Sequence, residues 1–352
     1  MHEHGGNLTP YLRKNQPESW IDFSANINCL GMPETVKHAA VQGVLDSFHY
    51  PDPGCNRLVE SISQSLSVNK NWILCGNGAA ELIYDALRVL SPRKALVAAP
   101  GFFEYEQALR SINCEIVYAS LQEKEGFLVT SSFLETLQET PGVELVILTN
   151  PNNPTGRLIP PETLKRILEV CQKKGIWFLL DECFLDFLPD GDAYTMMREL
   201  GGAENLFILK AFTKLYGMAG VRLGYGFCAD ETLLARMRNA GQPWAVSSLA
   251  QAGGVAALEQ TEYVEQVRLL IEKERPYLQA GLQALGLRVI SGKANYLLFR
   301  ATRTLGEEME RRGVVLRGCG NYPGLDDTWY RTAVRTRREN DILLQTLREV
   351  LG

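Results

Sequence analysis

The strongest constraint on the fold is a repeated alternation of short apolar runs with amphipathic stretches between residues 72 and 227. Runs that are apolar along their whole length are typical of strands buried on both faces, and amphipathic stretches such as residues 162–173 are typical of the helices that cover them. This order predicts an α/β fold with a mostly parallel sheet. The predicted strands are residues 72–74, 95–98, 115–118, 145–148, 176–180, 206–209 and 223–227.

The pattern changes after about residue 245, where a long helical stretch over 247–286 precedes further strand-like runs at 287–290, 296–299 and 330–334. A chain of 352 residues is long enough for two hydrophobic cores. We therefore expect a large domain over residues 46–245 and a small α+β domain over 246–352. The loop-rich first 45 residues are expected to pack with the small domain.

Composition and charge exclude several classes of protein. A net charge of −5 without a basic run indicates neither nucleic acid nor a membrane surface as a partner. The sequence has no apolar run of about 18 residues and no signal-peptide pattern, so no membrane-spanning helix is predicted. Its eight cysteines form no C-x-x-C pair, which favours reduced, buried thiols in a cytoplasmic protein over a metal site.

Two residues suggest a chemistry that requires an aldehyde cofactor. Lys214 follows the predicted strand 206–209, and Asp181 ends the predicted strand 176–180, so both lie where such sheets bind ligands. Pyridoxal phosphate needs an amine to hold its aldehyde and a carboxylate to keep its ring nitrogen protonated. A buried aspartate must also be paired or part of a site, because an isolated buried charge is costly. The alternatives are a solvated lysine and an aspartate that caps a helix.

Further residues match the remaining needs of that cofactor. The glycine-rich turn over residues 76–81, between a strand and a helix, offers backbone amides to a phosphate, and Arg222 offers a counter-charge. Asn153 follows a strand and has an amide that can reach a ring hydroxyl, and Phe102 can stack on a ring. Each also has a structural explanation: a common strand-to-helix turn, a proline-rich turn and a core phenylalanine.

Together these motifs resemble the fold-type I superfamily of pyridoxal-phosphate-dependent aminotransferases over nearly the whole chain. The resemblance implies a large domain with a mostly parallel seven-stranded sheet, a smaller α+β domain and pyridoxal 5'-phosphate as cofactor. It also implies that Lys214 holds the cofactor covalently, that Asp181 pairs with its ring nitrogen and that Asn153 meets its ring oxygen. By the same resemblance, Phe102 stacks on the ring, and the phosphate is surrounded by Gly78, Ala79, Thr213 and Arg222.

Tyr50, in the segment His49-Tyr50-Pro51-Asp52-Pro53, resembles the tyrosine that reaches the phosphate of the neighbouring subunit in this superfamily. The resemblance therefore implies a homodimer with shared active sites. One departure is Ala211, which stands where the family commonly has a serine that bonds the phosphate.

Two branches of the superfamily are close: histidinol-phosphate aminotransferases and the threonine-phosphate decarboxylases of cobalamin biosynthesis. The N-terminal motifs His4-Gly5-Gly6-Asn7 and Asp22 to Asn28 resemble the decarboxylases, and Phe184 stands where the aminotransferases typically have tyrosine. Arg335 stands where the aminotransferases usually have glycine. The residues expected to bind a small phosphorylated amino-acid substrate are His4, Asn28, Arg317, Arg331 and Arg335.

The decarboxylase resemblance implies conversion of L-threonine O-3-phosphate to (R)-1-amino-2-propanol O-2-phosphate. Histidinol-phosphate transamination stays as an alternative, because both reactions could use Arg331. Decarboxylation of L-serine O-phosphate stays as another, because one methyl group gives only about 1–3 kcal/mol of discrimination. A ligand-responsive regulator of the same fold is a third possibility. The acidic chain and the lack of an attached DNA-binding module in the sequence argue against it.

Overall fold

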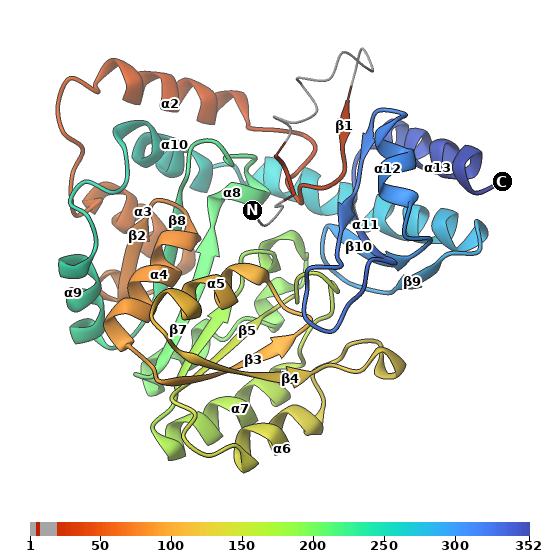
Figure 1. Ribbon diagram of the computed structural model, residues 1–352. Coiled ribbons are helices and arrows are strands. Elements are labelled where there is room, and N and C mark those ends of the chain that lie inside the picture. The colour runs from red at the N-terminus through yellow and green to blue at the C-terminus, as the bar shows by residue number, and fades with distance from the viewer. Residues whose placement is uncertain (1–4, 8–19) are drawn as a thin grey trace.

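The computed structural model describes residues 5–7 and 20–352. Within them, seven strands form a central sheet in the order β2-β8-β7-β6-β5-β3-β4 (Figure 1). Only β8 runs antiparallel to its neighbours β2 and β7, so the predicted α/β fold with a mostly parallel seven-stranded sheet is confirmed. The strands are β2 (Ile73–Gly76), β3 (Lys94–Ala99), β4 (Glu115–Ser120), β5 (Leu145–Thr149), β6 (Trp177–Asp181), β7 (Leu206–Ala211) and β8 (Gly224–Phe227).

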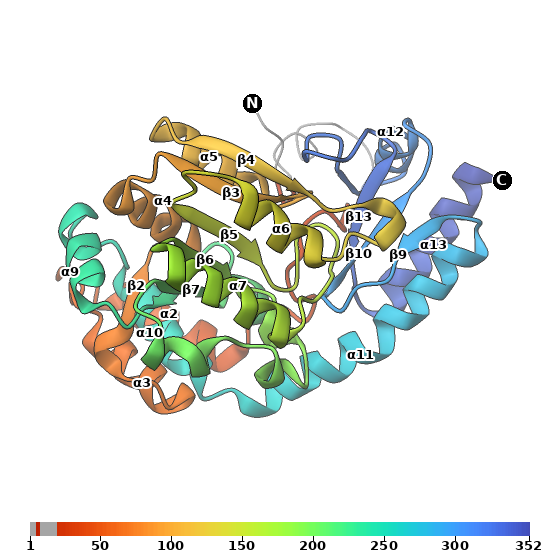
Figure 2. The ribbon, with the colours of Figure 1, turned by 90° about the horizontal axis from the view of Figure 1, so that it is seen from below.

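Helices cover both faces of this sheet. Val146 and Leu148 of β5 share one core with α6 and α7, whereas Leu145 and Ile147 of the same strand share another with α4, α5 and α9. Figure 2 shows α6 and α7 together on one face. Successive strand residues point to opposite faces, which explains why β5 is apolar throughout. The helices are α4 (Ala79–Leu90), α5 (Phe103–Ser111), α6 (Ser131–Glu139), α7 (Pro161–Lys174) and α9 (Glu231–Ala240).

A smaller unit contains the four-stranded antiparallel sheet β12-β13-β10-β9. Its core joins Tyr296, Leu297 and Phe299 of β10 to the apolar faces of α11, α12 and α13. These elements are β9 (Arg288–Ile290), β10 (Tyr296–Arg300), β12 (Arg317–Gly318), β13 (Trp329–Ala333), α11 (Thr261–Ala284), α12 (Leu305–Glu310) and α13 (Arg337–Leu351). The predicted strands of the C-terminal part are therefore present.

The packing of the helices after residue 245 bears on the predicted domain boundary, which stays a prediction. The helical stretch over 247–286 consists of two helices, α10 (Ser248–Leu258) and α11. Ala250 and Ala257 of α10 lie in the core of the large unit with α3 (Asn56–Leu66), whereas α11 contributes Val267 and Ile271 to the core of the small unit. Of these two helices, α10 therefore packs with the large unit and α11 with the small unit.

The first 45 residues divide between the two units. β1 (Ile21–Asp22) pairs in parallel with β11 (Val314–Val315) of the small unit. α2 (Glu34–Leu45) packs against α10 on the large unit instead (Figure 1). Of these two elements, β1 therefore contacts the small unit, and α2 contacts the large unit. In the described residues, no helix combines the length and the apolar character needed to cross a bilayer.

Candidate active site

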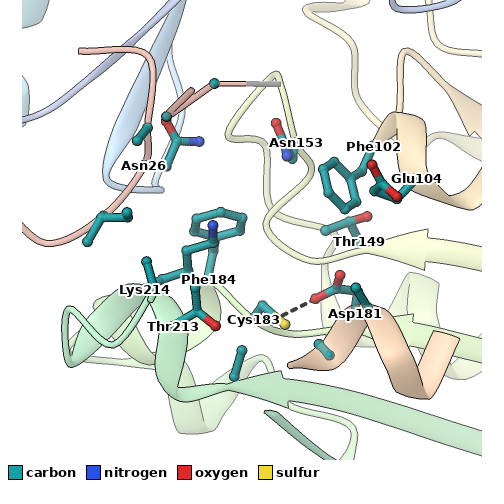
Figure 3. Close-up of a pocket in the computed structure, with 18 of the residues that line it drawn as sticks. Asn26, Phe102, Glu104, Thr149, Asn153, Asp181, Cys183, Phe184, Thr213 and Lys214 are labelled. Atoms are coloured by element: carbon teal, nitrogen blue, oxygen red, sulfur yellow. Dashed lines mark hydrogen bonds between the residues drawn. The ribbon is translucent and has the colours of Figure 1, made fainter. Parts of the chain in front are cut away.

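A cavity of about 500 Å³ lies where the carboxyl ends of the parallel strands face the small unit. The end of β6 contributes Asp181 to its wall, and the segments after β3, β5 and β7 contribute Phe102, Asn153 and Lys214 (Figure 3). Ligands bind at this edge in open α/β sheets, and the volume lies within the roughly 300–1,000 Å³ of small-molecule sites. Residues far apart in the sequence are therefore brought together as predicted from their positions after strands.

Lys214 lies in α8 (Phe212–Leu215), a single helical turn that directly follows β7. Its amine lies 5.9 Å from the centre of the Phe184 ring, inside the cavity. Burial and the positive charge of Arg331 lower the pKa of Lys214 to about 8. A lysine with a pKa this low has enough neutral amine near neutral pH to act as a nucleophile.

Asp181 is the last residue of β6 and is only 6% exposed. Its Oδ2 accepts a hydrogen bond of 2.6 Å from the Tyr105 hydroxyl, and its Oδ1 accepts one of 2.8 Å from the backbone N–H of Cys183. Figure 3 shows Asp181 and Lys214 on opposite sides of one space. The buried carboxylate is thus held by two donors and still lines the cavity, as expected of a partner for a cationic ring nitrogen.

The residues predicted to surround a phosphate lie around the N-terminus of α4. Gly78 precedes this helix with φ +81°, and a Cβ atom there would lie 2.7 Å from Nη2 of Arg222. Arg222 itself has φ +62°, which is uncommon for a residue with a side chain and typical of functional sites. Ala79, Thr213 and Arg222 line the cavity beside it. Free backbone amides at a helix N-terminus and a guanidinium group suit an anion.

Two arginines from the small unit project into the same cavity. Arg331 of β13 donates from Nη1 to Oδ1 of Asn153 at 2.6 Å and from Nη2 to the Ser24 carbonyl oxygen at 2.8 Å. Its buried Nε has no protein partner within the described residues. Arg317 of β12 donates to Oδ1 of Asn321 at 2.9 Å and lies over the ring of Tyr322. Both arginines are at least nine-tenths buried, so their positions are fixed before a ligand arrives.

Three predicted residues, Arg335, Asn28 and Tyr50, lie outside the cavity wall. Arg335 pairs with Glu339 at 2.6 Å and donates to the Asp22 carbonyl oxygen, outside the cavity wall. Asn28 donates from its side chain to the Leu215 carbonyl oxygen at 2.8 Å and from its backbone to that of Lys214 at 3.0 Å. It therefore ties the N-terminal segment to α8 and does not line the cavity. Tyr50 is 79% exposed, stacks on Trp244 and does not line the cavity, and His4 lies outside the described residues.

The sequence reasoning missed residues that the structure places at the site. Asn26 lines the cavity, is 2% exposed, and neither its Oδ1 nor its Nδ2 has a partner in the described residues. It stands two residues from the predicted Asn28, and the pattern Asn26-Ile27-Asn28 gives no signal that distinguishes the two. Tyr105 and Thr149 were also missed. Thr149 directly follows the predicted strand 145–148, which is the signal that had found Asp181.

The cavity fits pyridoxal 5'-phosphate group by group. Lys214 can hold the aldehyde, Asp181 the ring nitrogen, and the amide of Asn153 the ring oxygen, while Phe102 stands beside them. The Gly78 turn leaves room for a phosphate that a Cβ atom would restrict. Fold and site together define a pyridoxal-phosphate-dependent enzyme of fold type I.

Comparison with known proteins agrees with this class. Residues 18–347 match the family of aminotransferase class I and II. The threonine-phosphate decarboxylase of Salmonella typhimurium is 38% identical over 99% of this chain and 96% of its own length. The histidinol-phosphate aminotransferase of Methanothermobacter thermautotrophicus is 31% identical over 94% of this chain and 89% of its own. The chain belongs to the aminotransferase class I and II family.

A solved structure supports the same architecture. The histidinol-phosphate aminotransferase from Clostridium acetobutylicum is 30% identical and superposes with a TM-score of 0.86. The match covers 94% of this chain and 98% of that one. The two-unit arrangement and the seven-stranded sheet are therefore those of this family.

Proposed function

We propose that the chain decarboxylates L-threonine O-3-phosphate to (R)-1-amino-2-propanol O-2-phosphate in cobalamin biosynthesis, with pyridoxal 5'-phosphate as cofactor. The observation that carries the proposal is the placement of Arg317 and Arg331 in the same cavity as Lys214. Two buried guanidinium groups facing one space repel each other unless anions lie between them. Threonine phosphate carries a carboxylate and a phosphate on one small skeleton, so it supplies both anions at once.

The protein residues have distinct roles in this reaction. The bound cofactor supplies an electron sink for the bond that breaks at Cα. Asp181 keeps the ring nitrogen protonated, and Lys214 is placed to give a proton back to Cα. Arg317 and Arg331 fix the carboxylate and phosphate, so binding energy from the remote phosphate helps to orient the carboxylate for loss.

Asn26 replaces Asn28 as the expected substrate contact from the N-terminal segment. Its amide is buried and unpaired in the described residues, and it faces the cavity next to the Ser24 backbone that holds Arg331. An unpaired buried amide costs free energy that a ligand oxygen would recover. A substrate carboxylate or phosphate between Asn26 and Arg331 would satisfy both side chains.

Three further observations favour decarboxylation over transamination. Gly5 and Gly6, from the N-terminal motif of the decarboxylase branch, line the cavity. Phe184 faces Lys214 without the hydroxyl that aminotransferases typically have there. The 38% identity to a threonine-phosphate decarboxylase also exceeds the 31% and 30% to the two histidinol-phosphate aminotransferases. Histidinol-phosphate transamination is the second candidate, supported by the TM-score of that structure.

We also propose a homodimer in the cytoplasm. Leu45, Phe48 and Tyr50 are exposed apolar side chains at the end of α2 and just after it, and Phe48 is 92% exposed. Together with Trp244 they make a surface that a second copy of the chain would cover. Tyr50 would then be available to the phosphate site of the neighbouring subunit. All eight cysteines are free, which supports a reducing compartment.

The test uses purified protein loaded with pyridoxal phosphate and separate substrates. Threonine phosphate and serine phosphate are compared by the carbon dioxide released, and histidinol phosphate with 2-oxoglutarate by the glutamate formed. We expect carbon dioxide from threonine phosphate with the highest kcat/KM. Glutamate formation without carbon dioxide would overturn the decarboxylase proposal and favour the aminotransferase. Faster release from serine phosphate would change the substrate and leave the reaction type intact.

A further inference from the structure

Asp181 is held from behind the cavity wall by a chain of hydroxyl groups. The Tyr105 hydroxyl lies 2.6 Å from Oδ2 of Asp181 and 2.9 Å from Oγ1 of Thr149. Tyr105 lies on α5 and is 1% exposed, and the centre of its ring lies 5.5 Å from the centre of the Phe102 ring. Thr149 is the last residue of β5, and its register partner on β6 is Asp181. Three elements thus meet at the Tyr105 hydroxyl, which bonds both Thr149 and Asp181.

The direction of each hydrogen bond follows from counting protons. An ionised carboxylate only accepts, so Tyr105 must give its single proton to Asp181. The Tyr105 oxygen then accepts from Thr149, whose hydroxyl is the remaining donor of the pair. The backbone N–H of Cys183 donates to the other carboxylate oxygen. Burial and the charge of Asp181 raise the pKa of Tyr105 well above its usual value, so this phenol keeps its proton and stays a donor.

We propose that Tyr105 is a positioning residue, whose hydroxyl aims the Asp181 carboxylate at the ring nitrogen and keeps their shared proton on that nitrogen. A donor at Oδ2 stabilises the carboxylate form of Asp181, which favours the ion pair over a neutral acid beside a neutral ring. Thr149 strengthens the effect because it polarises the Tyr105 hydroxyl. The inference rests on the proposed role of Asp181 and is independent of which substrate the enzyme uses.

The test replaces Tyr105 with phenylalanine, which removes the hydroxyl and keeps the ring. The main measurement is the ring-nitrogen NMR resonance of isotopically labelled pyridoxal phosphate bound to the enzyme without substrate. We expect this resonance in Y105F to move toward the position of an unprotonated ring. We also expect kcat to fall roughly tenfold to hundredfold, the scale of a hydrogen bond to a charged group. KM should change less than about twofold, because the loss affects the transition state.

Tyr225→Phe is the matched control, because Tyr225 is a buried tyrosine on strand β8 of the same sheet that lies outside this chain of hydroxyls. It should leave the resonance unchanged. An unchanged resonance in folded, cofactor-loaded Y105F would overturn the proposal. Should Y105F fail to fold, Thr149→Val tests the same proposal. We expect a smaller displacement of the ring-nitrogen resonance in the same direction. An unchanged resonance in this variant would again overturn the proposal. Because no substrate is present, a failed decarboxylase assay leaves this result intact.

Discussion

Arg331 and Asn153 are 178 positions apart in the chain and are joined by a hydrogen bond of 2.6 Å between Nη1 and Oδ1. The bond links β13 of the small unit to the loop after β5 of the large unit. With its oxygen occupied, the side-chain amide of Asn153 presents N–H donors to a ligand. The bond therefore fixes the guanidinium of Arg331 and orients the side-chain amide of Asn153 at the same time.

Arg331 should also control the proton on Lys214. Burial and the like charge of Arg331 are the two largest causes that lower the pKa of Lys214 to about 8. Because a neutral amine attacks the cofactor aldehyde, the rate of cofactor uptake by the cofactor-free protein should rise with pH through about 8. Removing the like charge favours the protonated amine, so Arg331→Gln should move this midpoint upward by up to about one unit. The measurement is cofactor absorbance after rapid mixing over a pH series.

Arg335→Gln is the control for that experiment, because Arg335 pairs with Glu339 outside the cavity. Its uptake midpoint should match that of the wild type. A midpoint in Arg331→Gln that stays in place or moves downward would contradict the electrostatic role of Arg331.

Gly78→Ala should weaken cofactor binding more than it weakens the fold. The new Cβ atom would lie 2.7 Å from Nη2 of Arg222 and would push that guanidinium out of the phosphate site. Loss of one hydrogen bond to a charged group predicts a cofactor Kd raised about tenfold or more. The positive φ of +81° adds a backbone cost of about 1 kcal/mol or more to the unfolding free energy. The measurements are equilibrium titration with pyridoxal phosphate and urea unfolding of the cofactor-free protein.

Gly142→Ala separates these two effects. Gly142 has a similar φ of +74°, and a Cβ atom there meets nothing within 4 Å. This variant should lose a similar amount of stability and keep its cofactor affinity. Equal affinity losses in the two variants would mean that backbone strain, and not the contact with Arg222, weakens binding.

The strands and the residues at their ends were predictable because two physical rules act locally. Buried strands are apolar throughout, and ligands lie at their carboxyl ends, so Asp181 and Lys214 could be found from the apolar runs before them. Asn26 and Arg335 could not be placed in this way. Two asparagines two residues apart in a segment without regular structure differ only in tertiary contacts, and Asn28 is taken by α8.

The sequence does contain a signal for the structural role of Arg335. Thr336 and Glu339 form a capping box at the start of α13, which fixes the Glu339 carboxylate beside Arg335. The spacing of threonine and glutamate by three residues is the usual signature of that motif. A carboxylate fixed beside an arginine makes it less available to a substrate, so the box favours a structural role for Arg335.

Lys210→Met should strongly destabilise the large unit. The Lys210 amine is buried 2.6 Å from Asp186 and 3.8 Å from Glu182, whose carboxylate also bonds Thr195. Burial alone would lower the pKa of Lys210, but Asp186 and Glu182 together raise it. Removing the cation leaves the buried Glu182 carboxylate without its charged partner, and loss of one member of a buried pair typically costs about 3–5 kcal/mol. Urea unfolding of the cofactor-free protein measures this cost.

Lys37→Ala gives the comparison for Lys210, because Lys37 forms an exposed pair with Glu34 at 2.5 Å. Exposed pairs contribute about 0–1 kcal/mol, so this variant should unfold close to the wild type. Adding Glu182→Gln to Lys210→Met should restore part of the stability. Similar losses of unfolding free energy in the Lys37 and Lys210 variants would contradict the prediction. They would mean that Lys210, Asp186 and Glu182 do not form a buried charged cluster.

Tyr50 and Trp244 stack with their ring centres 4.3 Å apart on an exposed surface, and Tyr50 does not line the cavity of its own subunit. Lys214 and Asp181, in contrast, line one cavity of one chain. If Tyr50 contributes to the active site of the neighbouring subunit, a Tyr50 substitution damages the partner's site. A substitution of Lys214 or Asp181 damages the site of the subunit that carries it.

Mixing inactive Lys214→Ala subunits with Tyr50→Ala subunits should therefore restore activity. A mixed dimer has one site with both lesions and one intact site, and random pairing should return about a quarter of wild-type activity. The control mixes Lys214→Ala with Asp181→Asn, where every site keeps one lesion and no activity should return. Sedimentation must first show that the Tyr50→Ala protein still forms dimers. Activity no higher than the control would place Tyr50 outside the neighbouring site, because each mixed dimer would then lack an intact one.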